Sequence, residues 1–293
     1  MVQGFLSLNK PTGMTSHDCV GRVRRLLGIK RVGHGGTLDP LATGVLPIAL
    51  GSATRLLQFL PADKVYRATI RLGITTTTDD LAGEVLAKRP ISELNFESVK
   101  LGLQQFQGPI QQVPPDYSAI QIQGQRLYDL ARQGKVVEVQ SRLVEIHQLE
   151  ILAWRPGAFP EIDLAIACGP GTYIRAIARD LGASLKTGGT LAALTRTASN
   201  GFNLLDSLSF KALEAQVENQ IFIPIPPADA LGHLPLIKLS AEIAQRWSYG
   251  QKIALSPDQV SSSEILRVHH EEGHFLGIAQ QVESILVPKV VLQ

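Results

Sequence analysis

A single carboxylate, Asp39, stands apart near the N-terminus because it is the only acid between Asp18 and Asp63. A glycine-rich stretch at 33–36 precedes it, and glycine lets the backbone adopt positive φ or pass close to another molecule. Pro40 follows and disfavours helical geometry at Asp39. An aspartate before proline commonly serves as a turn or cap acid, whereas an isolated carboxylate can also act as a nucleophile. The residues alone leave both interpretations open.

An arginine that could form an ion pair with this carboxylate lies far along the chain. Residues 168–171 break a predicted strand, and a helix is expected from Thr172 onward with Tyr173 and Arg175 in its first turn. The N-terminal end of a helix is electropositive and favours acids, so an arginine there indicates a carboxylate opposite it. Such a partner would favour the ionised form that nucleophilic attack requires, whereas burial would oppose it.

A tyrosine, Tyr66, lies in a segment that alternates polar and apolar side chains. The alternation at 64–72 predicts a strand. Tyr66 falls on its apolar face with Ile70 and Leu72, and the simplest interpretation of the residue is a core tyrosine. The threonine-rich segment at 75–83 is expected to form a polar turn.

Positive charge is concentrated in the N-terminal 34 residues, although the whole chain has a formal net charge of only +2. Six basic residues against one acid give this segment a balance of +5: Lys10, Arg22, Arg24, Arg25, Lys30 and Arg31. A basic patch beside a candidate site is typical of binding to a polyanion such as nucleic acid. The alternative is a solvated helix face, and the sequence does not decide between them.

The glycine-rich stretch matches no known phosphate cradle. It lacks the Gly-Lys-Ser/Thr ending of a P-loop, and Leu38 stands where a dinucleotide-binding loop has its third glycine. No Gly-x-Ser-x-Gly elbow occurs. The cluster at 269–274 holds three histidines and two glutamates, but it is expected to span a hairpin turn and lacks the HExxH spacing. We therefore expect neither a metal nor a cofactor.

Composition indicates an ordinary globular protein, with 44% hydrophobic residues in 293. The two cysteines, Cys19 and Cys168, form no CxxC pair, which favours a reducing compartment. The N-terminal apolar cluster is too short for a signal peptide, and no apolar run approaches the ~18 residues of a membrane span. We expect a cytoplasmic protein that does not associate with membranes.

Strands and helices are both expected along the chain. Strands are predicted at 4–9, 45–50, 64–72, 136–151, 161–167 and 191–197, and helices at 52–60, at 94–106, after Ser16 as N-cap, and from Thr172. Two adjacent prolines and weak periodicity at 108–134 are typical of a mobile flap. Four prolines mark 223–235 as a linker. Beyond it, a short helix and alternating strands predict a small β-rich module.

Four separated segments carry the residues of one enzyme family in the same order. They are GHGGTLDPLATG at 33–44, KVYR at 64–67, VPPDYSA at 113–119 and GTYIR at 171–175. Together they make the chain similar to the TruB family of tRNA pseudouridine synthases. The resemblance implies an α+β fold, with a mixed, largely antiparallel sheet flanked by helices in a catalytic domain at 1–222. It also implies a flap-like insertion at about 108–142, and a PUA-like domain at 236–293.

The resemblance implies an isomerase that turns one T-loop uridine of tRNA, at position 55, into pseudouridine with no cofactor or metal. Asp39 matches the nucleophile, and whether it attacks C6 of the base or the sugar stays open. Tyr66 matches the tyrosine that stacks on the target base, and Arg175 the arginine that pairs with the nucleophile. Four more positions match residues around the flipped base: Tyr173 and Leu194 line the uracil pocket, His34 fills the vacated space, and Asp80 supports the arginine.

The implied partner is the T arm of tRNA, and the enzyme is expected to be a monomer with no obligate protein partner. Four positions depart from the family pattern: Gly35 replaces a threonine, Gln121 a lysine, Gly169-Pro170 a Ser-Lys pair and Thr195 an arginine. Three of these remove positive charge, which bears on RNA affinity. The alternative function is a tRNA-binding or folding-assistance module with secondary catalysis, a role that would not require the Asp39 carboxylate.

Overall fold

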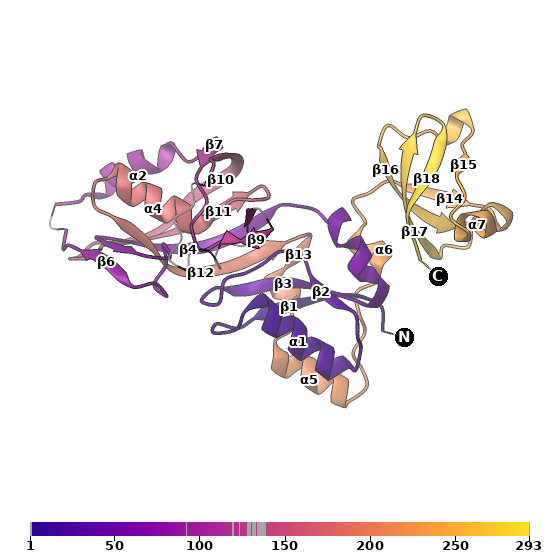
Figure 1. Ribbon diagram of the computed structural model, residues 1–293, viewed down its shortest axis with the longest axis horizontal. Helices are drawn as coiled ribbons and strands as arrows, with labels where there is room; N and C mark the ends of the chain where they lie inside the picture. Colours follow the sequence, from indigo (N-terminus) through magenta and orange to yellow (C-terminus); the bar gives the residue numbers. More distant parts are fainter. Residues whose placement is uncertain are drawn as a thin grey trace.

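The computed structural model describes residues 2–91, 93–118, 120–122, 124–127, 130, 133 and 139–292. Figure 1 shows two parts along the long axis of the molecule: a large N-terminal part around a nine-stranded sheet and a smaller C-terminal part around a five-stranded sheet. The chain passes between them through the short helix α6 (Pro227–Ala230).

The nine-stranded sheet is mixed and largely antiparallel, which confirms the implied fold class. The strand order is β1 (Gly4–Lys10), β3 (Thr43–Leu50), β12 (Gly189–Ser199), β4 (Lys64–Leu72), β11 (Glu161–Cys168), β10 (Arg142–Arg155) and β7 (Gly108–Gln112), while β2 (Val32–His34) pairs with β3 and β13 (Phe202–Asn203) with β12. Among the pairs of this sheet that the structure describes, β3 and β12 alone run parallel. This pair places the chain after Asp39 directly beside β12.

Helices cover the two ends of this sheet (Figure 1). They are α1 (Ser16–Leu27) and α5 (Phe210–Glu218) at the β1–β3 end, α2 (Phe96–Gln104) and α4 (Ile174–Ser184) at the other end, and the 3-10 helices η1 (Gly51–Phe59) and η2 (Leu204–Asp206). At one end Leu8, Val20 and Leu213 share a core, and at the other Ile70 and Leu181 do. The four α-helices thus bury apolar side chains against the sheet.

The first helix, α1, begins one residue earlier than expected, because its N-cap is Thr15. Thr15 Oγ1 accepts a hydrogen bond from the Asp18 N–H at 3.0 Å, and the Asp18 carboxylate accepts one from the Thr15 N–H at 2.9 Å. These two bonds form a capping box. Ser16, the expected cap, instead bonds to both the N–H (2.8 Å) and the carbonyl oxygen (3.0 Å) of Leu38, next to Asp39.

Two short hairpins extend from the main sheet. β5 (Ile74–Thr76) and β6 (Val85–Lys88) pair within and after the threonine-rich segment, and β8 (Gln121–Ile122) pairs with β9 (Gln125–Arg126) inside the implied flap. The start of that flap, β7, is an edge strand of the main sheet. Residues 119, 123, 128–129, 131–132 and 134–138 of the flap lie outside the described residues.

The C-terminal sheet has the order β14 (Leu236–Leu239), β16 (Ile265–His270), β17 (Phe275–Val282), β18 (Ile285–Val291) and β15 (Ile253–Ala254), with α7 (Ala241–Ser248) and the 3-10 helix η3 (Pro257–Gln259). Trp247 of α7 is fully buried against it. The proline-rich segment before this sheet is not a free spacer. Ile225 exchanges two 2.8 Å backbone hydrogen bonds with Phe5, and Leu231 is fully buried. Among the helices of the described residues, none is long and apolar enough to cross a membrane.

Gly44 lets β3 and β12 lie against each other. Its φ is +103°, and a Cβ atom there would overlap the carbonyl oxygen of Arg196 and lie 2.8 Å from its backbone nitrogen. Both atoms belong to the backbone, so neither can rotate away. A side chain at this position would separate the parallel pair that follows the Asp39 loop.

We expect Gly44→Ala to lower the free energy of unfolding by at least about 3 kcal/mol, because backbone strain and steric overlap combine. Gly108→Ala is the control, since Gly108 has a φ of +82° in the same sheet but nothing within 4 Å of an added Cβ. Its loss should be limited to strain of about 1–2 kcal/mol. Urea unfolding followed by circular dichroism measures both variants. Equal losses would contradict the close approach as the cause.

Candidate active site

Side chains from distant elements hold the backbone before Asp39. Arg196 of β12 donates hydrogen bonds to the carbonyl oxygens of residues 36 and 37, at 3.1 and 3.2 Å. Ser16 of α1 bonds to both backbone groups of Leu38. Three consecutive residues are thus fixed by side chains, which limits the positions open to the carboxylate that follows.

Lys10 holds the chain on the other side of Asp39. Its Nζ donates to the carbonyl oxygens of Pro11 (2.8 Å), Met14 (2.7 Å) and Pro40 (3.2 Å). The side chain is fully buried, and this burial lowers the pKa of Lys10. Three carbonyl oxygens take the place of water around the ammonium group.

The predicted N-terminal basic patch is therefore only partly present. Lys10 is fully buried, so it is not placed to hold a phosphate, and Arg22 forms a 2.6 Å ion pair with Glu214. The remaining four basic residues are exposed: Arg24, Arg25, Lys30 and Arg31. At one departure from the family pattern, Thr195 Oγ1 lies 2.9 Å from Thr43 Oγ1 and joins the parallel strands.

Arg175 forms the carboxylate pair that its helix position indicated. Its Nε lies 2.9 Å from Asp39 Oδ2, and its Nη2 donates to Oδ1 at 3.3 Å, so the two groups meet in the bidentate geometry typical of arginine and carboxylate. The Arg175 side chain is only 5% exposed, whereas that of Asp39 is 34% exposed. The guanidinium therefore lies beneath a carboxylate that faces solvent.

Two backbone carbonyls hold Arg175 in turn. Nη1 donates to Thr78 at 2.9 Å, and Nη2 donates to Tyr117 at 3.0 Å. The carboxylate of Asp80 lies 3.8 Å from Nε and accepts a 2.6 Å hydrogen bond from the Thr78 hydroxyl. A second acid thus lies beside the guanidinium, where the resemblance implied a supporting one.

One turn further along α4, Arg179 contacts the same two segments. Its Nη1 donates to Asp79 Oδ2 at 3.2 Å, and its Nη2 donates to the carbonyl oxygen of Val113 at 2.8 Å. Burial raises the pKa of Asp79, while the Arg179 guanidinium acts in the opposite sense. The two arginines of α4 therefore tie the turn around residue 79 to the segment 113–117.

A small cavity lies beside Asp39. Its volume is about 10 Å³, and its walls are Asp39, Leu41, Ala42, Asp80 and residues 191–194. Leu194, expected to line a uracil pocket, is among them. A cavity of about 10–15 Å³ holds a single water molecule, so a nucleobase could enter only after the walls move.

Tyr66 lies inside the sheet, as its strand pattern predicted, and is 7% exposed. It stands opposite Arg196 of β12 on one side and Ile166 of β11 on the other. Burial raises the pKa of Tyr66 to about 12, and the neighbouring Arg196 guanidinium acts in the opposite sense. The phenol is therefore protonated at neutral pH.

Tyr173 is the N-cap of α4 and is held through its backbone. Gln112 accepts a hydrogen bond from the Tyr173 N–H at 2.8 Å and donates one to its carbonyl oxygen at 3.1 Å. The guanidinium of Arg142 lies 4.7 Å from the centre of the Tyr173 ring and donates to the carbonyl oxygen of Gly171. These contacts fix the start of the helix that carries Arg175.

The glycine-rich loop begins at His34, which ends β2 opposite Ile48 of β3. The Gly35 N–H donates to the carbonyl oxygen of Pro47 at 2.8 Å. A Cβ atom at position 35 would lie 3.3 Å from Asn200 Oδ1 and from Pro47 Cβ. The threonine common in the family would need these neighbours to shift, so glycine here fits this chain's own packing.

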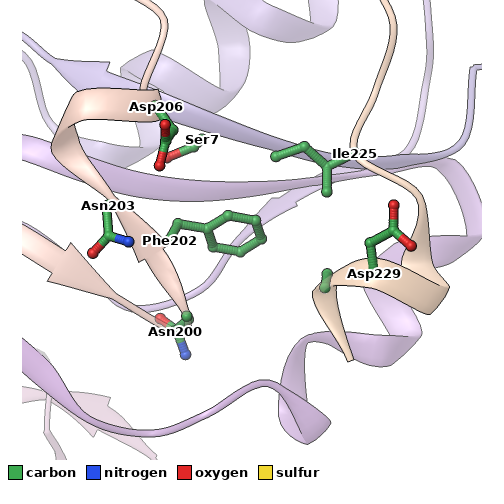
Figure 2. A pocket seen from close by; sticks show the side chains of 9 residues that line it. Ser7, Asn200, Phe202, Asn203, Asp206, Ile225 and Asp229 are labelled. Carbon is green, nitrogen blue, oxygen red and sulfur yellow. The ribbon is translucent and has the colours of Figure 1, made fainter. Parts of the chain in front are cut away.

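A larger cavity, of about 220 Å³, lies elsewhere (Figure 2). It is formed where the turn after β12 meets the segment before the C-terminal sheet, and shares no lining residue with the cavity beside Asp39. Phe202 forms part of its wall, and Asp206 and Asp229 stand on opposite sides of it (Figure 2). Two exposed carboxylates disfavour an RNA phosphate, so size alone does not make this cavity the active site.

The histidine-rich segment lies in the hairpin between β16 and β17, as its sequence indicated. His269 Nδ1 lies 3.0 Å from the carbonyl oxygen of Gly273. Within the described part of the chain, no group of three or more His, Cys, Asp or Glu side chains is arranged to hold a metal ion.

Sequence reasoning missed four side chains that position the site: Gln112, Arg142, Arg179 and Arg196. Arg196 could have been found from the sequence, because it lies inside the predicted strand at 191–197 and a buried arginine needs partners. Gln112 could not, because an amide in a proline-rich segment gives no indication of a partner 61 residues away.

Comparison with known proteins identifies the family. Residues 24–174 match the family model "TruB family pseudouridylate synthase (N terminal domain)", and residues 235–292 match "Pseudouridine synthase II TruB, C-terminal". The tRNA pseudouridine synthase B of Trichormus variabilis is 55% identical over 293 residues, which cover 100% of this chain and 99% of that protein. The protein of the same name from Acaryochloris marina is 56% identical over 289 residues, with 99% and 98% covered.

A chain in the crystal structure of a Cbf5-Nop10-Gar1 complex superposes with a TM-score of 0.74 at 22% identity, covering 99% of this chain and 84% of that chain. At this identity the likeness bears on the fold alone. With both domain matches and relatives similar over their full length, the chain belongs to the TruB family of pseudouridylate synthases.

The raised pKa of Tyr66 predicts a loss of stability at alkaline pH. Between its ordinary pKa of 10.0 and about 12, the folded protein keeps the phenol protonated while the unfolded chain releases the proton, so the free energy of unfolding falls as pH rises. From about pH 9 to about pH 11, wild type should lose about 1 kcal/mol more than Tyr66→Phe. Urea unfolding measures this, with the exposed Tyr249→Phe as control. Parallel losses in wild type and Tyr66→Phe would contradict it.

Proposed function

We propose that this protein converts the T-loop uridine at position 55 of tRNA into pseudouridine and that Asp39 is the nucleophile. Isomerisation of tRNA uridine is the activity in the names of its relatives. The observation that carries the assignment of Asp39 is its bidentate pair with the buried Arg175, at the wall of a cavity. An arginine beneath a carboxylate favours the ionised form that attack requires.

The reaction breaks the bond between N1 of uracil and C1′ of the sugar, turns the base, and joins C5 to C1′. N1 gains a proton and C5 loses one, so the nucleotide keeps its composition. Asp39 supplies the nucleophile, either to C6 of the base or to C1′, and is released when the new bond is complete. Arg175 orients the carboxylate throughout, because both of its contacts with Asp39 come from one rigid guanidinium.

The target uridine must leave the base stack to reach Asp39, at a cost of a few kcal/mol. Stacking on an aromatic side chain offsets part of this cost, and we assign that contact to Tyr66 once the cavity has opened. We propose that Tyr66 also acts as a base on the sugar once the opened cavity exposes its phenol, because burial raises the pKa of Tyr66 to about 12 in the closed form. Four further side chains complete the proposed pocket: Tyr173 and Leu194 against uracil, His34 in the vacated space, and Asp80 beside Arg175.

The proposed partner is the T arm of tRNA, held by phosphate contacts that position the RNA without reading its sequence. The exposed basic residues at 24–25 and 30–31 and the flap at 108–142 are the surfaces we assign to this contact. We propose that the enzyme acts as a cytoplasmic monomer without an obligate protein partner. A role limited to RNA binding would leave the Arg175–Asp39 pair without a use, because stacking and phosphate contacts need no carboxylate.

Release of tritium from T-arm RNA that carries 5-tritiated uridine tests the nucleophile, because joining C5 to C1′ displaces the hydrogen on C5. We expect release by wild type and a loss on the order of 10³-fold or more in Asp39→Asn, with RNA affinity unchanged within about threefold. Asp163→Asn is a matched control, because Asp163 also pairs with an arginine (Arg155, 2.6 Å) but lies on β11. Tritium release that persists in Asp39→Asn would refute the assignment.

A further inference from the structure

Arg196 is a fully buried cation whose three guanidinium nitrogens all donate to backbone carbonyls. Nε donates to Val45 at 2.8 Å, Nη1 to Thr37 at 3.2 Å, and Nη2 to Gly36 at 3.1 Å. Within the described residues, no carboxylate forms an ion pair with it. A buried charge is costly unless its hydrogen bonds are satisfied, and here the satisfying groups all belong to one segment of chain.

Those three carbonyls lie on both sides of Asp39. Gly36 and Thr37 belong to the glycine-rich loop that leads to the carboxylate, and Val45 belongs to β3, which leads away from it. One planar guanidinium therefore connects the two arms of the Asp39 loop. A lysine ammonium could not do so in the same way, because it is a compact charge without the rigid fork of arginine.

Arg196 also lies beside Tyr66. The two residues stand opposite each other in the antiparallel pair of β12 and β4, so their side chains project from the same face of the sheet with Cβ atoms about 5 Å apart. Burial raises the pKa of the Tyr66 phenol, and the Arg196 guanidinium lowers it. The same side chain is thus next to the tyrosine and bonded to the loop of the aspartate.

We propose that Arg196 is a positioning residue for the reaction: its guanidinium sets the place of the Asp39 loop relative to Tyr66. It acts through these two residues, because a fully buried side chain does not reach the substrate. The inference rests on the roles proposed above for Asp39 and Tyr66. Misplacement of a reacting group by about 1 Å can cost about 100-fold in rate, so loss of the fork should reduce the chemical step more than RNA binding.

The test compares Arg196→Lys, which keeps the charge but loses the fork, with wild type. We expect the single-turnover rate of pseudouridine formation at saturating T-arm RNA to fall about 10- to 100-fold, while the RNA dissociation constant changes less than about threefold. Arg71→Lys is the control, since Arg71 lies on β4 and pairs with Glu161 at 2.6 Å. A rate within about threefold of wild type, or an equal loss of affinity, would overturn the proposal.

A double-mutant cycle separates positioning from general loss of structure. If Arg196 acts through its placement of the loop against Tyr66, Arg196→Lys combined with Tyr66→Phe should be no slower than the slower single variant. If the rate losses of the two single variants multiply in the double variant, the proposal is overturned. If Arg196→Lys does not fold, Arg196→Gln replaces it, and failure of both to fold would show a role in folding instead. Asp39→Asn in the same assay tests the nucleophile separately, whatever Arg196 does.

Discussion

The bidentate pair between Arg175 and Asp39 constrains the elements on every side of the site. A buried guanidinium requires partners for its donors, and these come from Asp39, the turn at Thr78 and the segment at Tyr117. The helix that carries Arg175 must therefore start at a defined place, which Gln112 fixes by bonding both backbone groups of the N-cap residue. The guanidinium of Arg175 thus joins α4 to the Asp39 loop, the turn at Thr78 and the segment at Tyr117.

Three buried cations share this device of satisfying a charge with backbone carbonyls. Lys10 holds the chain just after Asp39, Arg196 joins the backbone on both sides of it, and Arg175 lies beneath the carboxylate. A backbone carbonyl is present whatever the side chain, so these contacts do not depend on the identity of the partner residue. Asp39, at 2.9 Å from Arg175 Nε, lies closer to the guanidinium than Asp80, at 3.8 Å. The result is a carboxylate on a loop whose backbone is hydrogen-bonded by side chains on both sides of it, which suits preorganised chemistry.

The sequence was most informative where structure is local. The alternation at 64–72 predicted both the strand bounds and the burial of Tyr66, and the helix N-terminus indicated a carboxylate partner for Arg175. Contacts between segments far apart in the chain could not be predicted in this way. Ser16 was expected to cap a helix, yet tertiary contact with Leu38 prevailed. Lys10 was counted as surface charge, although its carbonyl partners bury it.

We propose that Arg175 acts on the chemistry of Asp39 rather than on RNA binding. Arg175→Lys keeps the charge but removes the planar fork that contacts both carboxylate oxygens. Arg155→Lys, in an ion pair on β10, is its control. The decisive measurement is the single-turnover rate together with the RNA dissociation constant. For Arg175→Lys we expect a rate at least about 100-fold lower, with affinity within about threefold of wild type. An unchanged rate, or equal losses of rate and affinity, would contradict it.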